Sequence, residues 1–292
     1  MADKKDSGGD SVLPGGLYII ATPIGNIEDI TLRALDILKK VDLIACEDTR
    51  VSGKLTSYYD ITAPKTPYHD HNADEVRPRL IAQLKEGKRV ALISDAGMPL
   101  VSDPGYKLVA ACAAEGIAMT CIPGASASLT ALVLSGLPTD KFMFAGFLPP
   151  KSAARRTALA EVKAVPATLV FYETGPRLAE SLADMQAVLG DRPAAVAREL
   201  TKKFEEVRRG SLSALIKYYQ ASEEPRGEIA VVVGAPVAGQ AEDWSEQAID
   251  DLLLEMIDKQ GMSVKDAAAF VAAKSGLKKR DVYQRALILK NK

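Results

Sequence analysis

Short apolar runs alternate with helix-length segments through the first part of the chain. The runs have the length and composition of buried strands and lie at Leu17–Ala21, Val41–Cys46, Arg89–Ile93 and Ile117–Ile122. Segments with apolar residues at helical spacing lie between them, at Thr31–Lys40, Arg77–Lys85 and Tyr106–Glu115. A strand that is followed by a helix and another strand is the repeating unit of a parallel sheet. The sequence therefore predicts an α/β domain whose mainly parallel sheet carries helices on its faces.

The pattern changes near Gly136, where a second α/β domain is expected to begin. Its strands are predicted at Phe142–Phe147, Thr168–Tyr172, Ala194–Arg198 and Glu228–Gly234, with helices at Arg155–Val162 and Pro176–Leu189. Three further helices are predicted at Trp244–Lys259, Ser263–Ser275 and Lys278–Leu289. The predicted organisation is a disordered leader (1–14), an N-terminal α/β domain (15–137), a second α/β domain (138–234), a linker (235–243) and a C-terminal helical module (244–292).

Composition excludes several classes of protein. Charged residues interrupt every apolar run before the ~18 residues that a membrane helix needs, so no membrane span is predicted. The leader has no apolar core and is not interpreted as a secretion signal. The cysteines, Cys46, Cys112 and Cys121, form no C-x-x-C pair. Such a set favours a reducing cytoplasm and argues against a zinc site, so no bound metal is predicted.

Loops rich in small residues follow three of the predicted strands. They span Ala21–Asn26, Ser94–Gly105 and Ile122–Ala127. None of them carries the glycine pattern of a dinucleotide fold or of a P-loop. Each loop alone is also compatible with an ordinary turn. Ligands of α/β sheets bind where the carboxyl ends of the strands meet, and small residues let the backbone approach a ligand closely, so the three loops together predict a binding site.

Long blocks of the chain form an ordered series: LYIIATPIGNIEDITLRAL, EDTR, YHDHN, SDAGMPLVSDPG, PGASA, SGLPTDKFMFAGFLP and ARELTKKFEEVRRGSL. This series closely resembles the bacterial 16S ribosomal RNA cytidine-2′-O-methyltransferases, a branch of the tetrapyrrole-methylase superfamily. The resemblance runs from about Gly16 to Val233 and recurs in GMSVKDAAAFVAAKSGLKKRDVY. It implies two α/β domains of the class III methyltransferase type, with S-adenosylmethionine in a cleft between them, in a cytoplasmic homodimer. The implied activity is methylation of a cytidine ribose hydroxyl in the decoding region of 16S ribosomal RNA.

Matched motif by motif, the resemblance assigns a set of cofactor contacts: Pro23, Ala96, Gly97, Met98, Val101, Ser126, Ala127, Glu173 and Leu200. Most of these positions are small or apolar, which implies contact through the backbone. The chain departs from the family pattern in two places. Met98 stands where the family has Thr, and Thr174-Gly175-Pro176 stands where it has Ser-Pro-His.

A ribose hydroxyl is a weak nucleophile at neutral pH, so a carboxylate that accepts its proton would assist the reaction. Glu47 and Asp48, directly after a predicted strand, are the candidates placed first, and the further candidates are Asp95, Asp103 and Glu199. Acidic residues at strand ends are also often helix caps, and the sequence does not select between these roles. The hypothesis places the EDTR loop against the target ribose, with Arg50 on a phosphate.

Basic residues in or beside the recognised blocks are candidates to hold RNA phosphates. Those placed first are Arg50, Lys202, Lys278, Lys279 and Arg280, and the others are Lys54, Lys151, Arg155, Arg156, Arg177, Arg198 and Lys203. Residues 262–292 carry eight Lys or Arg and two Asp, which predicts a helix-turn-helix-like RNA clamp or, alternatively, a solvated helical face. The histidines His69 and His71 are interpreted as RNA contacts or structural residues, because no third metal ligand is evident.

Two other functions remain open at this point. A methyltransferase that acts on a small tetrapyrrole would share the fold and the cofactor loops. A transcription regulator without catalytic activity would use the C-terminal helices on DNA. The basic C-terminal module and the EDTR and YHDHN blocks favour RNA over a tetrapyrrole. The intact cofactor loops argue against the regulator, because a protein that only binds DNA does not need them.

Overall fold

The computed structural model describes residues 13–102, 105–236, 246–275 and 277–290. Two compact units make up the chain, and the second unit takes residues 235–292 together with the short segment 164–166. Nearly all of the predicted leader and linker lies outside the described residues. Within the described residues, no helix has both the length and the apolar character that crossing a membrane requires.

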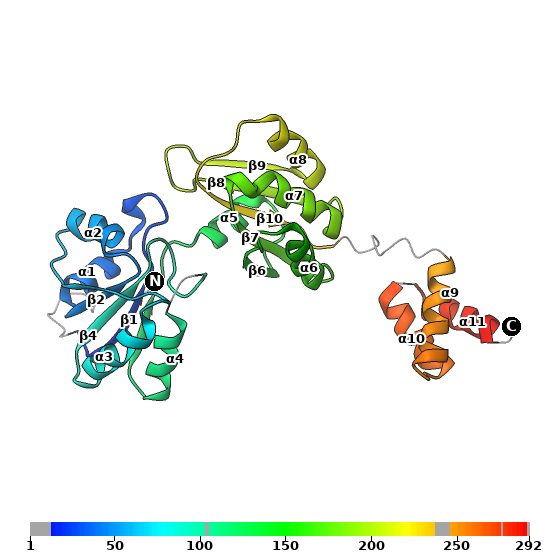
Figure 1. Cartoon of the computed structure of the whole chain (residues 1–292), viewed down its shortest axis with the longest axis horizontal. Helices are drawn as coiled ribbons and strands as arrows, with labels where there is room; N and C mark the ends of the chain where they lie inside the picture. The colour runs from blue at the N-terminus through cyan, green and yellow to red at the C-terminus, as the bar shows by residue number, and fades with distance from the viewer. Residues whose placement is uncertain (1–12, 103–104, 237–245, 276, 291–292) are drawn as a thin grey trace, which may run out of the picture. The chain divides into compact units, whose positions relative to one another are not determined.

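The first sheet has five strands in the order β3-β2-β4-β1-β5, and every neighbouring pair is parallel. Its strands β2, β4 and β1 lie side by side in Figure 1. Its strands are β1 (Gly16–Ile20), β2 (Leu43–Cys46), β3 (Lys65–Pro67), β4 (Arg89–Ile93) and β5 (Met119–Ile122). The helices that connect them are α1 (Leu32–Lys40), α2 (Thr49–Tyr58), α3 (Ala73–Lys85) and α4 (Tyr106–Ala114). The predicted parallel α/β sheet is confirmed.

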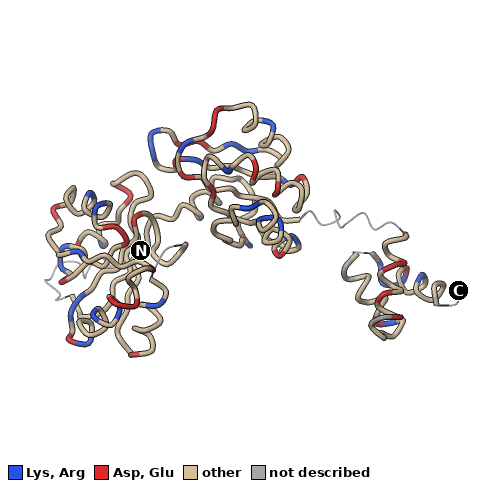
Figure 2. The backbone as a smooth tube through the Cα atoms, in the orientation of Figure 1, with Lys and Arg blue, Asp and Glu red and all other residues tan. Residues whose placement is uncertain are grey.

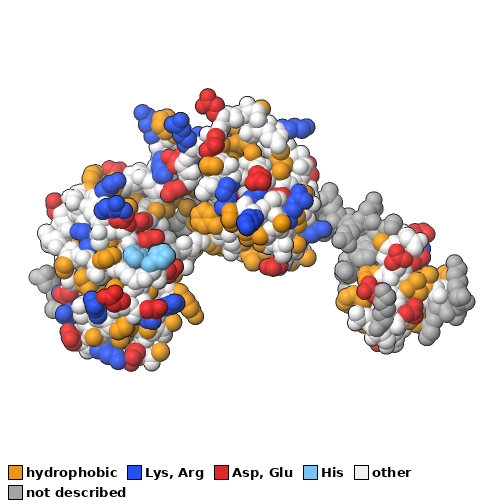
Figure 3. All heavy atoms as spheres, viewed as in Figure 1, with side chains coloured by type: hydrophobic (Ala, Val, Ile, Leu, Met, Phe, Trp, Pro, Cys, Tyr) orange, Lys and Arg blue, Asp and Glu red, His pale blue; other side chains and the backbone are white. Residues whose placement is uncertain are grey.

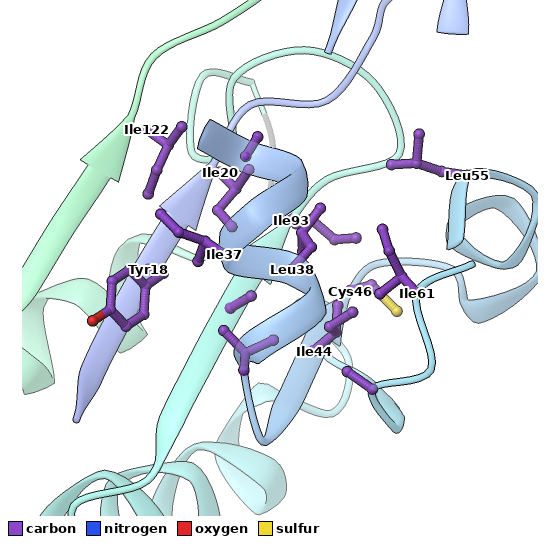
Figure 4. Close-up of a cluster of buried hydrophobic side chains, with 14 of the residues drawn as sticks. Tyr18, Ile20, Ile37, Leu38, Ile44, Cys46, Leu55, Ile61, Ile93 and Ile122 are labelled. Carbon is purple, nitrogen blue, oxygen red and sulfur yellow. The ribbon is translucent and has the colours of Figure 1, made fainter. Parts of the chain in front are cut away.

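Alternation of side chains along β1 gives this sheet a core on each face. Tyr18 and Ile20 point to one face, where they join a cluster with Ile37 and Leu38 of α1 (Figure 4). Leu17 points to the other face and packs in a cluster that includes residues of α3 and α4. Because both faces are covered, β1, β2 and β4 are almost continuously apolar, which is why the sequence identified these three strands directly.

The second sheet has the order β6-β7-β10-β8-β9 and is mostly antiparallel. Only its β6–β7 pair is parallel. Its strands are β6 (Phe142–Phe147), β7 (Thr168–Thr174), β8 (Pro193–Arg198), β9 (Glu206–Ser211) and β10 (Glu228–Val233). The accompanying helices are α6 (Ser152–Val162), α7 (Gly175–Leu189) and α8 (Leu212–Ala221).

Helix α5 (Ala127–Ser135) joins the two sheets in the sequence and packs on the second one. Ala131 and Leu132 lie in one cluster with Val170 of β7 and Val232 of β10. Ile24, from the loop after β1, belongs to the same cluster. The core of the second sheet therefore begins before the boundary at residue 137 that the sequence predicts, and it reaches a loop of the first sheet.

Several elements were missed by the sequence-based prediction, namely α2, β3, β9 and α8. The strand β9 has the sequence EVRRGS, and α2 contains Gly53 in its interior, so neither carries a clear apolar period. Helix α3 begins at Ala73 instead of the predicted Arg77, because Pro78 is accommodated inside the helix instead of limiting it.

The described residues of the C-terminal unit form three helices, as predicted. They are α9 (Glu246–Leu254), which continues into the π-helical turn η2 (Glu255–Lys259), then α10 (Val264–Ser275) and α11 (Lys279–Lys290). Their apolar faces enclose a small core: Ile249, Leu253, Ala267, Ala268, Val271, Ala272, Val282 and Ala286. Ser263 caps α10, since its Oγ accepts the N–H of Asp266 at 3.2 Å.

A buried ion pair ties α6 to α7. The guanidinium of Arg155 is fully buried, and its Nε lies 2.7 Å from Oδ2 of Asp184, whose side chain is 4% exposed. Arg156 and Ser152 bind the other carboxylate oxygen, at 2.6 and 3.0 Å. Arg155 was predicted to be an RNA contact, and its burial shows that this prediction is wrong.

The ion pair generates a prediction about stability. Replacing Asp184 with Ala leaves the Arg155 guanidinium buried without its main partner, so Asp184→Ala should lower the free energy of unfolding by about 3–5 kcal/mol. Urea denaturation of the full chain measures this change. The matched control is Asp140→Ala at an exposed position, where a change within about 0.5 kcal/mol is expected. A loss below about 1 kcal/mol for Asp184→Ala would contradict the assigned role of the pair.

Candidate functional site

A hollow of about 310 Å³ lies where loops after the strands of the first sheet meet residues of the second sheet. The loop after β4 and the start of α5 form one side of its lining, and β7, β8 and β10 contribute to the other. Its described lining residues are Ile24, Asp95, Ala96, Gly97, Met98, Val101, Ser102, Ser126, Ala127, Phe147, Tyr172, Glu173, Thr174, Ala197, Leu200, Gly227, Glu228, Ile229 and Ala230. We call it the large hollow, because more residues line it than line the second hollow described below.

The floor of the large hollow is fixed by a backbone bridge between two loops. The N–H of Thr22 donates to the carbonyl of Gly97 at 2.9 Å, and the N–H of Gly97 donates to the carbonyl of Thr22 at 3.1 Å. Gly97 has a φ of +81°, and a Cβ there would lie 3.3 Å from Cγ2 of Ile24. Further along this loop, Leu100 and Ser102 also hold positive φ angles, 71° and 62°, which side-chain-bearing residues rarely adopt.

The loop after β5 also approaches the loop after β1 closely. A Cβ on Gly124 would lie 2.9 Å from the Cβ of Ala21, so only glycine fits without a shift. Ser126 then caps α5, accepting the N–H of Leu129 at 3.5 Å, and Ala127 opens the helix. The amino end of α5 is therefore part of the hollow wall, and free N–H groups at such an end favour negatively charged or carbonyl groups of a ligand.

A tight turn after β8 closes another side of the large hollow. Leu200 lines the hollow, and its neighbours Glu199 and Thr201 have positive φ angles of 49° and 64°. Lys202 Nζ holds the turn through ion pairs with Glu199 at 2.8 Å and Glu228 at 3.0 Å. The hydrogen bond from Lys202 is the main cause that lowers the pKa of Glu199. Glu199 thus stabilises the turn and is a weak proton acceptor.

Glu173 lines the large hollow at the end of β7, yet its carboxylate is engaged inside the protein. Its Oε2 accepts the hydroxyl of Ser181 at 2.5 Å, and its Oε1 accepts the N–H of Thr174 at 2.8 Å. Arg177 forms an ion pair with it at 3.2 Å. This arrangement fits contact with a ligand through the backbone of Glu173 instead of its carboxylate.

A second hollow, of about 450 Å³, opens beside the loop after β2. We call it the small-loop hollow, because the short EDTR segment supplies half of its lining residues. Its lining residues are Glu47, Asp48, Thr49, Arg50, Pro67, His69, His71 and Asp95. The candidates from the EDTR and YHDHN blocks are thus brought together in one place.

Asp48 and Arg50 are bound to each other across the start of α2. The carboxylate of Asp48 caps this helix, because its Oδ1 accepts the N–H of Arg50 at 2.8 Å. The guanidinium Nη2 of Arg50 lies 2.6 Å from Oδ2 of the same carboxylate. Hydrogen bonds from the Arg50 side chain lower the pKa of Asp48 to about 2. Asp48 therefore accepts a proton less readily than an ordinary carboxylate.

Glu47 and Asp95 have the opposite property. Burial raises the pKa of Glu47, and the charge of Asp95 raises it further. Burial is also the largest cause that raises the pKa of Asp95. Oδ1 of Asp95 accepts the N–H of Asp48 at 3.1 Å. Asp103, a further candidate from the sequence, lies outside the described residues.

The two histidines lie against each other at the rim of the small-loop hollow. Their ring centroids are 5.9 Å apart, and the pale blue imidazoles lie at the surface beside acidic side chains in Figure 3. Nδ1 of His69 is buried and has no hydrogen-bond partner among the described residues. Across the described part of the chain, no three His, Cys, Asp or Glu side chains gather in a way that would hold a metal ion.

Basic and acidic residues are interleaved along the chain, as the colours of the backbone tube in Figure 2 show. Of the basic residues placed first for RNA, Arg50 has a side chain that is 89% exposed, whereas Lys202 is engaged with Glu199 and Glu228. Lys278, Lys279 and Arg280 are exposed just before and at the start of α11. These exposed cations of the C-terminal unit are therefore better placed for a phosphate contact than Lys202.

Comparison with known proteins adds to this geometry. Residues 16–216 match the family described as Tetrapyrrole (Corrin/Porphyrin) Methylases, and residues 245–290 match the family described as RsmI C-terminal HTH domain. The Ribosomal RNA small subunit methyltransferase I of Mesorhizobium japonicum is 52% identical over 280 residues, which cover 96% of this chain and 94% of that protein. The protein of the same description from Halalkalibacterium halodurans is 46% identical over 272 residues, covering 92% and 93%.

The chain belongs to the ribosomal RNA small subunit methyltransferase I family. Solved structures of tetrapyrrole methylases and their relatives share the fold of its α/β part. The cobalt precorrin-4 methyltransferase CbiF has a TM-score of 0.56 at 16% identity, covering 75% of this chain and 94% of that chain. Diphthine synthase has a TM-score of 0.59 at 17% identity, covering 75% and 89%.

The large hollow contains every cofactor residue that the resemblance implies for this family, except Pro23. Pro23 is half-buried between Thr22 and Ile24, and only Ile24 is in the described lining. Residues of the second sheet were missed, among them Tyr172, Ile229 and Ala230. The sequence predicts the strands that contain them. It carries no local signal for which face of those strands meets the loops of the first sheet.

The contact between the loop after β1 and the turn after β8 generates a prediction. A Cβ on Gly25 would lie 2.5 Å from Cγ of Lys202 and 2.9 Å from the carbonyl oxygen of Leu200. Gly25→Ala should therefore force the turn away and lower the free energy of unfolding by about 1–3 kcal/mol. Chemical denaturation measures the change.

The control is Gly53→Ala in the interior of α2. No atom lies within 4 Å of a Cβ at Gly53, so alanine should stabilise the helix by roughly 0.5–1 kcal/mol. The two substitutions add the same methyl group and should change stability in opposite directions. If Gly25→Ala were neutral or stabilising, the tight fit of the two loops would be refuted.

Proposed function

We propose that this protein transfers the methyl group of S-adenosylmethionine to the ribose 2′-hydroxyl of a cytidine in the decoding region of 16S ribosomal RNA. We further propose that it acts in the cytoplasm as a homodimer. The observation that carries the proposal is the large hollow, whose lining gathers the cofactor residues that the resemblance implies, apart from Pro23. Membership in the family and the names of its relatives support ribosomal RNA as the substrate.

The large hollow fits a flat, partly apolar cofactor with charged groups at one end. Leu200, Ile24 and Met98 supply apolar walls. Gly97 lets the backbone come close, because a side chain at that position would enter space beside Ile24. The bound cofactor would supply an activated methyl group, so the protein's part is to place the acceptor oxygen in line with it.

The small-loop hollow would receive the acceptor. In this proposal Arg50 meets a phosphate with its exposed guanidinium, and a carboxylate that lines this hollow takes the hydroxyl proton. Of the two carboxylates that the sequence places first, Glu47 is the stronger candidate, because the ion pair with Arg50 lowers the pKa of Asp48. Asp48 then acts through the start of α2, which it caps.

Cofactor binding supplies the first test. The purified protein should bind S-adenosylmethionine or S-adenosylhomocysteine in calorimetry without added metal. Gly97→Leu should abolish the binding heat, because its side chain would occupy the hollow. The control is Gly116→Leu, which also places leucine at a positive φ, +65°, but has open space around it and does not line the hollow.

Both variants put leucine at a positive φ, but only Gly97→Leu fills the hollow, so only this variant should lose binding. A folded Gly97→Leu variant that binds normally would show that the cofactor lies elsewhere. The reaction itself is tested with small ribosomal subunits from a strain that lacks the gene. Ribose methylation of a 16S cytidine by the wild-type protein is expected, and methylation of a base or no methylation would contradict the proposal.

The exposed cations near the start of α11 generate a separate prediction. Replacing Lys278, Lys279 and Arg280 with Gln should weaken binding to small ribosomal subunits and leave S-adenosylhomocysteine binding unchanged. The slope of log affinity against log salt should become shallower by about 1 for each cation that meets a phosphate. The control replaces Lys39 and Lys40, which are exposed at the end of α1, with Gln and should leave the slope unchanged. An unchanged slope in the triple variant would assign these cations to a solvated face.

A further inference from the structure

The large hollow and the small-loop hollow share one residue of their described linings, Asp95. Every other lining residue belongs to only one of the two. Asp95 is therefore the one described residue that would lie beside a ligand in either hollow. Glu47 and Asp48 line only the small-loop hollow.

Asp95 is held in place from both sides. The backbone just before it is fixed because the hydroxyl of Thr22 donates to the carbonyl of Ser94 at 3.1 Å. The backbone just after it is fixed by the double bridge between Thr22 and Gly97. The N–H of Asp48 binds Oδ1 at 3.1 Å and is, within the described part of the chain, the only hydrogen-bond donor to this carboxylate. Oδ2 therefore remains available to a ligand in a fixed position.

The neighbouring carboxylates either bind other side chains or line only one of the two hollows. Asp48 is bound to Arg50, Glu199 to Lys202, and Glu173 to Ser181 and Arg177. Asp95 forms no such ion pair among the described residues, and its partial burial raises its pKa, which strengthens it as a proton acceptor.

The other walls of the small-loop hollow suit a nucleotide. Arg50 offers an exposed cation for a phosphate. His69 brings a buried Nδ1 that has no partner among the described residues, and His71 lies exposed beside it. The volume of about 450 Å³ falls within the range of small-ligand sites.

We propose that the small-loop hollow binds the acceptor nucleotide and that Asp95 is the catalytic carboxylate that accepts the proton of its ribose hydroxyl. This inference rests on the proposed function. As the oxygen forms its bond to the methyl carbon, the sulfur–carbon bond breaks and its electron pair stays on sulfur. The O–H bond breaks at the same time, and its proton moves to Oδ2 of Asp95 and from there to solvent.

Single-turnover methylation of small ribosomal subunits tests the assignment. Asp95→Asn keeps the shape and still accepts the Asp48 N–H, but it removes the charge, so the rate should fall at least roughly a hundredfold. Binding of S-adenosylhomocysteine in calorimetry should persist, because Asn keeps the shape of a side chain that lines the large hollow, and this binding also reports on folding. The control, Asp140→Asn, should match the wild type.

The possible results separate the two proposals. If the wild type does not methylate the ribose, the proposed function fails. If it does, and Asp95→Asn loses less than about tenfold, the inference fails while the function stands. A larger deficit for Glu47→Gln than for Asp95→Asn would move the proton to Glu47 and also overturn the inference.

A binding measurement needs no turnover. With S-adenosylhomocysteine present, ligand-observed NMR compares cytidine 5′-monophosphate with 2′-deoxycytidine 5′-monophosphate. The ribonucleotide should bind roughly tenfold more tightly to the wild type, because its hydroxyl donates to the charged Asp95. Asp95→Ala should remove this difference. Equal affinities of the two nucleotides for the wild type, or no binding of either, would contradict the assignment.

Discussion

The pair of backbone hydrogen bonds between Thr22 and Gly97 is the constraint on which the site depends. It joins the loop after β1 to the loop after β4, whose strands are neighbours in the first sheet. Both bonds join backbone groups, so they do not depend on a particular side chain. They do require glycine at position 97, where φ is +81°. Through these two hydrogen bonds, the first sheet determines the positions of Asp95 and Gly97 in the lining of the large hollow. Ile24, from the loop after β1, packs into the core of the second sheet.

Acidic residues around the site fall into two groups with different chemistry. Asp48, Glu173 and Glu199 are bound to cations or hydroxyl groups, and they shape turns and helix starts. Glu47 and Asp95 are partly buried without a matching cation among the described residues, and burial raises their pKa values. A carboxylate is thus a structural anion where a cation binds it and a better proton acceptor where it is partly buried without one.

The sequence predicted those features that are local. The strands β1, β2 and β4 are continuous apolar runs because both faces of the sheet are covered, and the three small-residue loops follow from strand ends. The edge strand β9 was missed because its charged side chains pair with neighbours and leave no apolar period. The distinction between Asp48 and Asp95 was also out of reach, because it depends on one ion pair and on two hollows that meet at one residue.

Leu100 and Ser102 carry the loop after β4 through left-handed backbone angles without the help of glycine. Each such residue costs roughly 1–2 kcal/mol relative to a relaxed backbone. Glycine at either position would relieve this cost but would remove a side chain that packs against the core, in Leu100, or lines the large hollow, in Ser102. The loop after β4 thus keeps its shape at a cost in stability. An engineer who seeks a heat-resistant variant should therefore leave this loop unchanged and gain stability in helices remote from it.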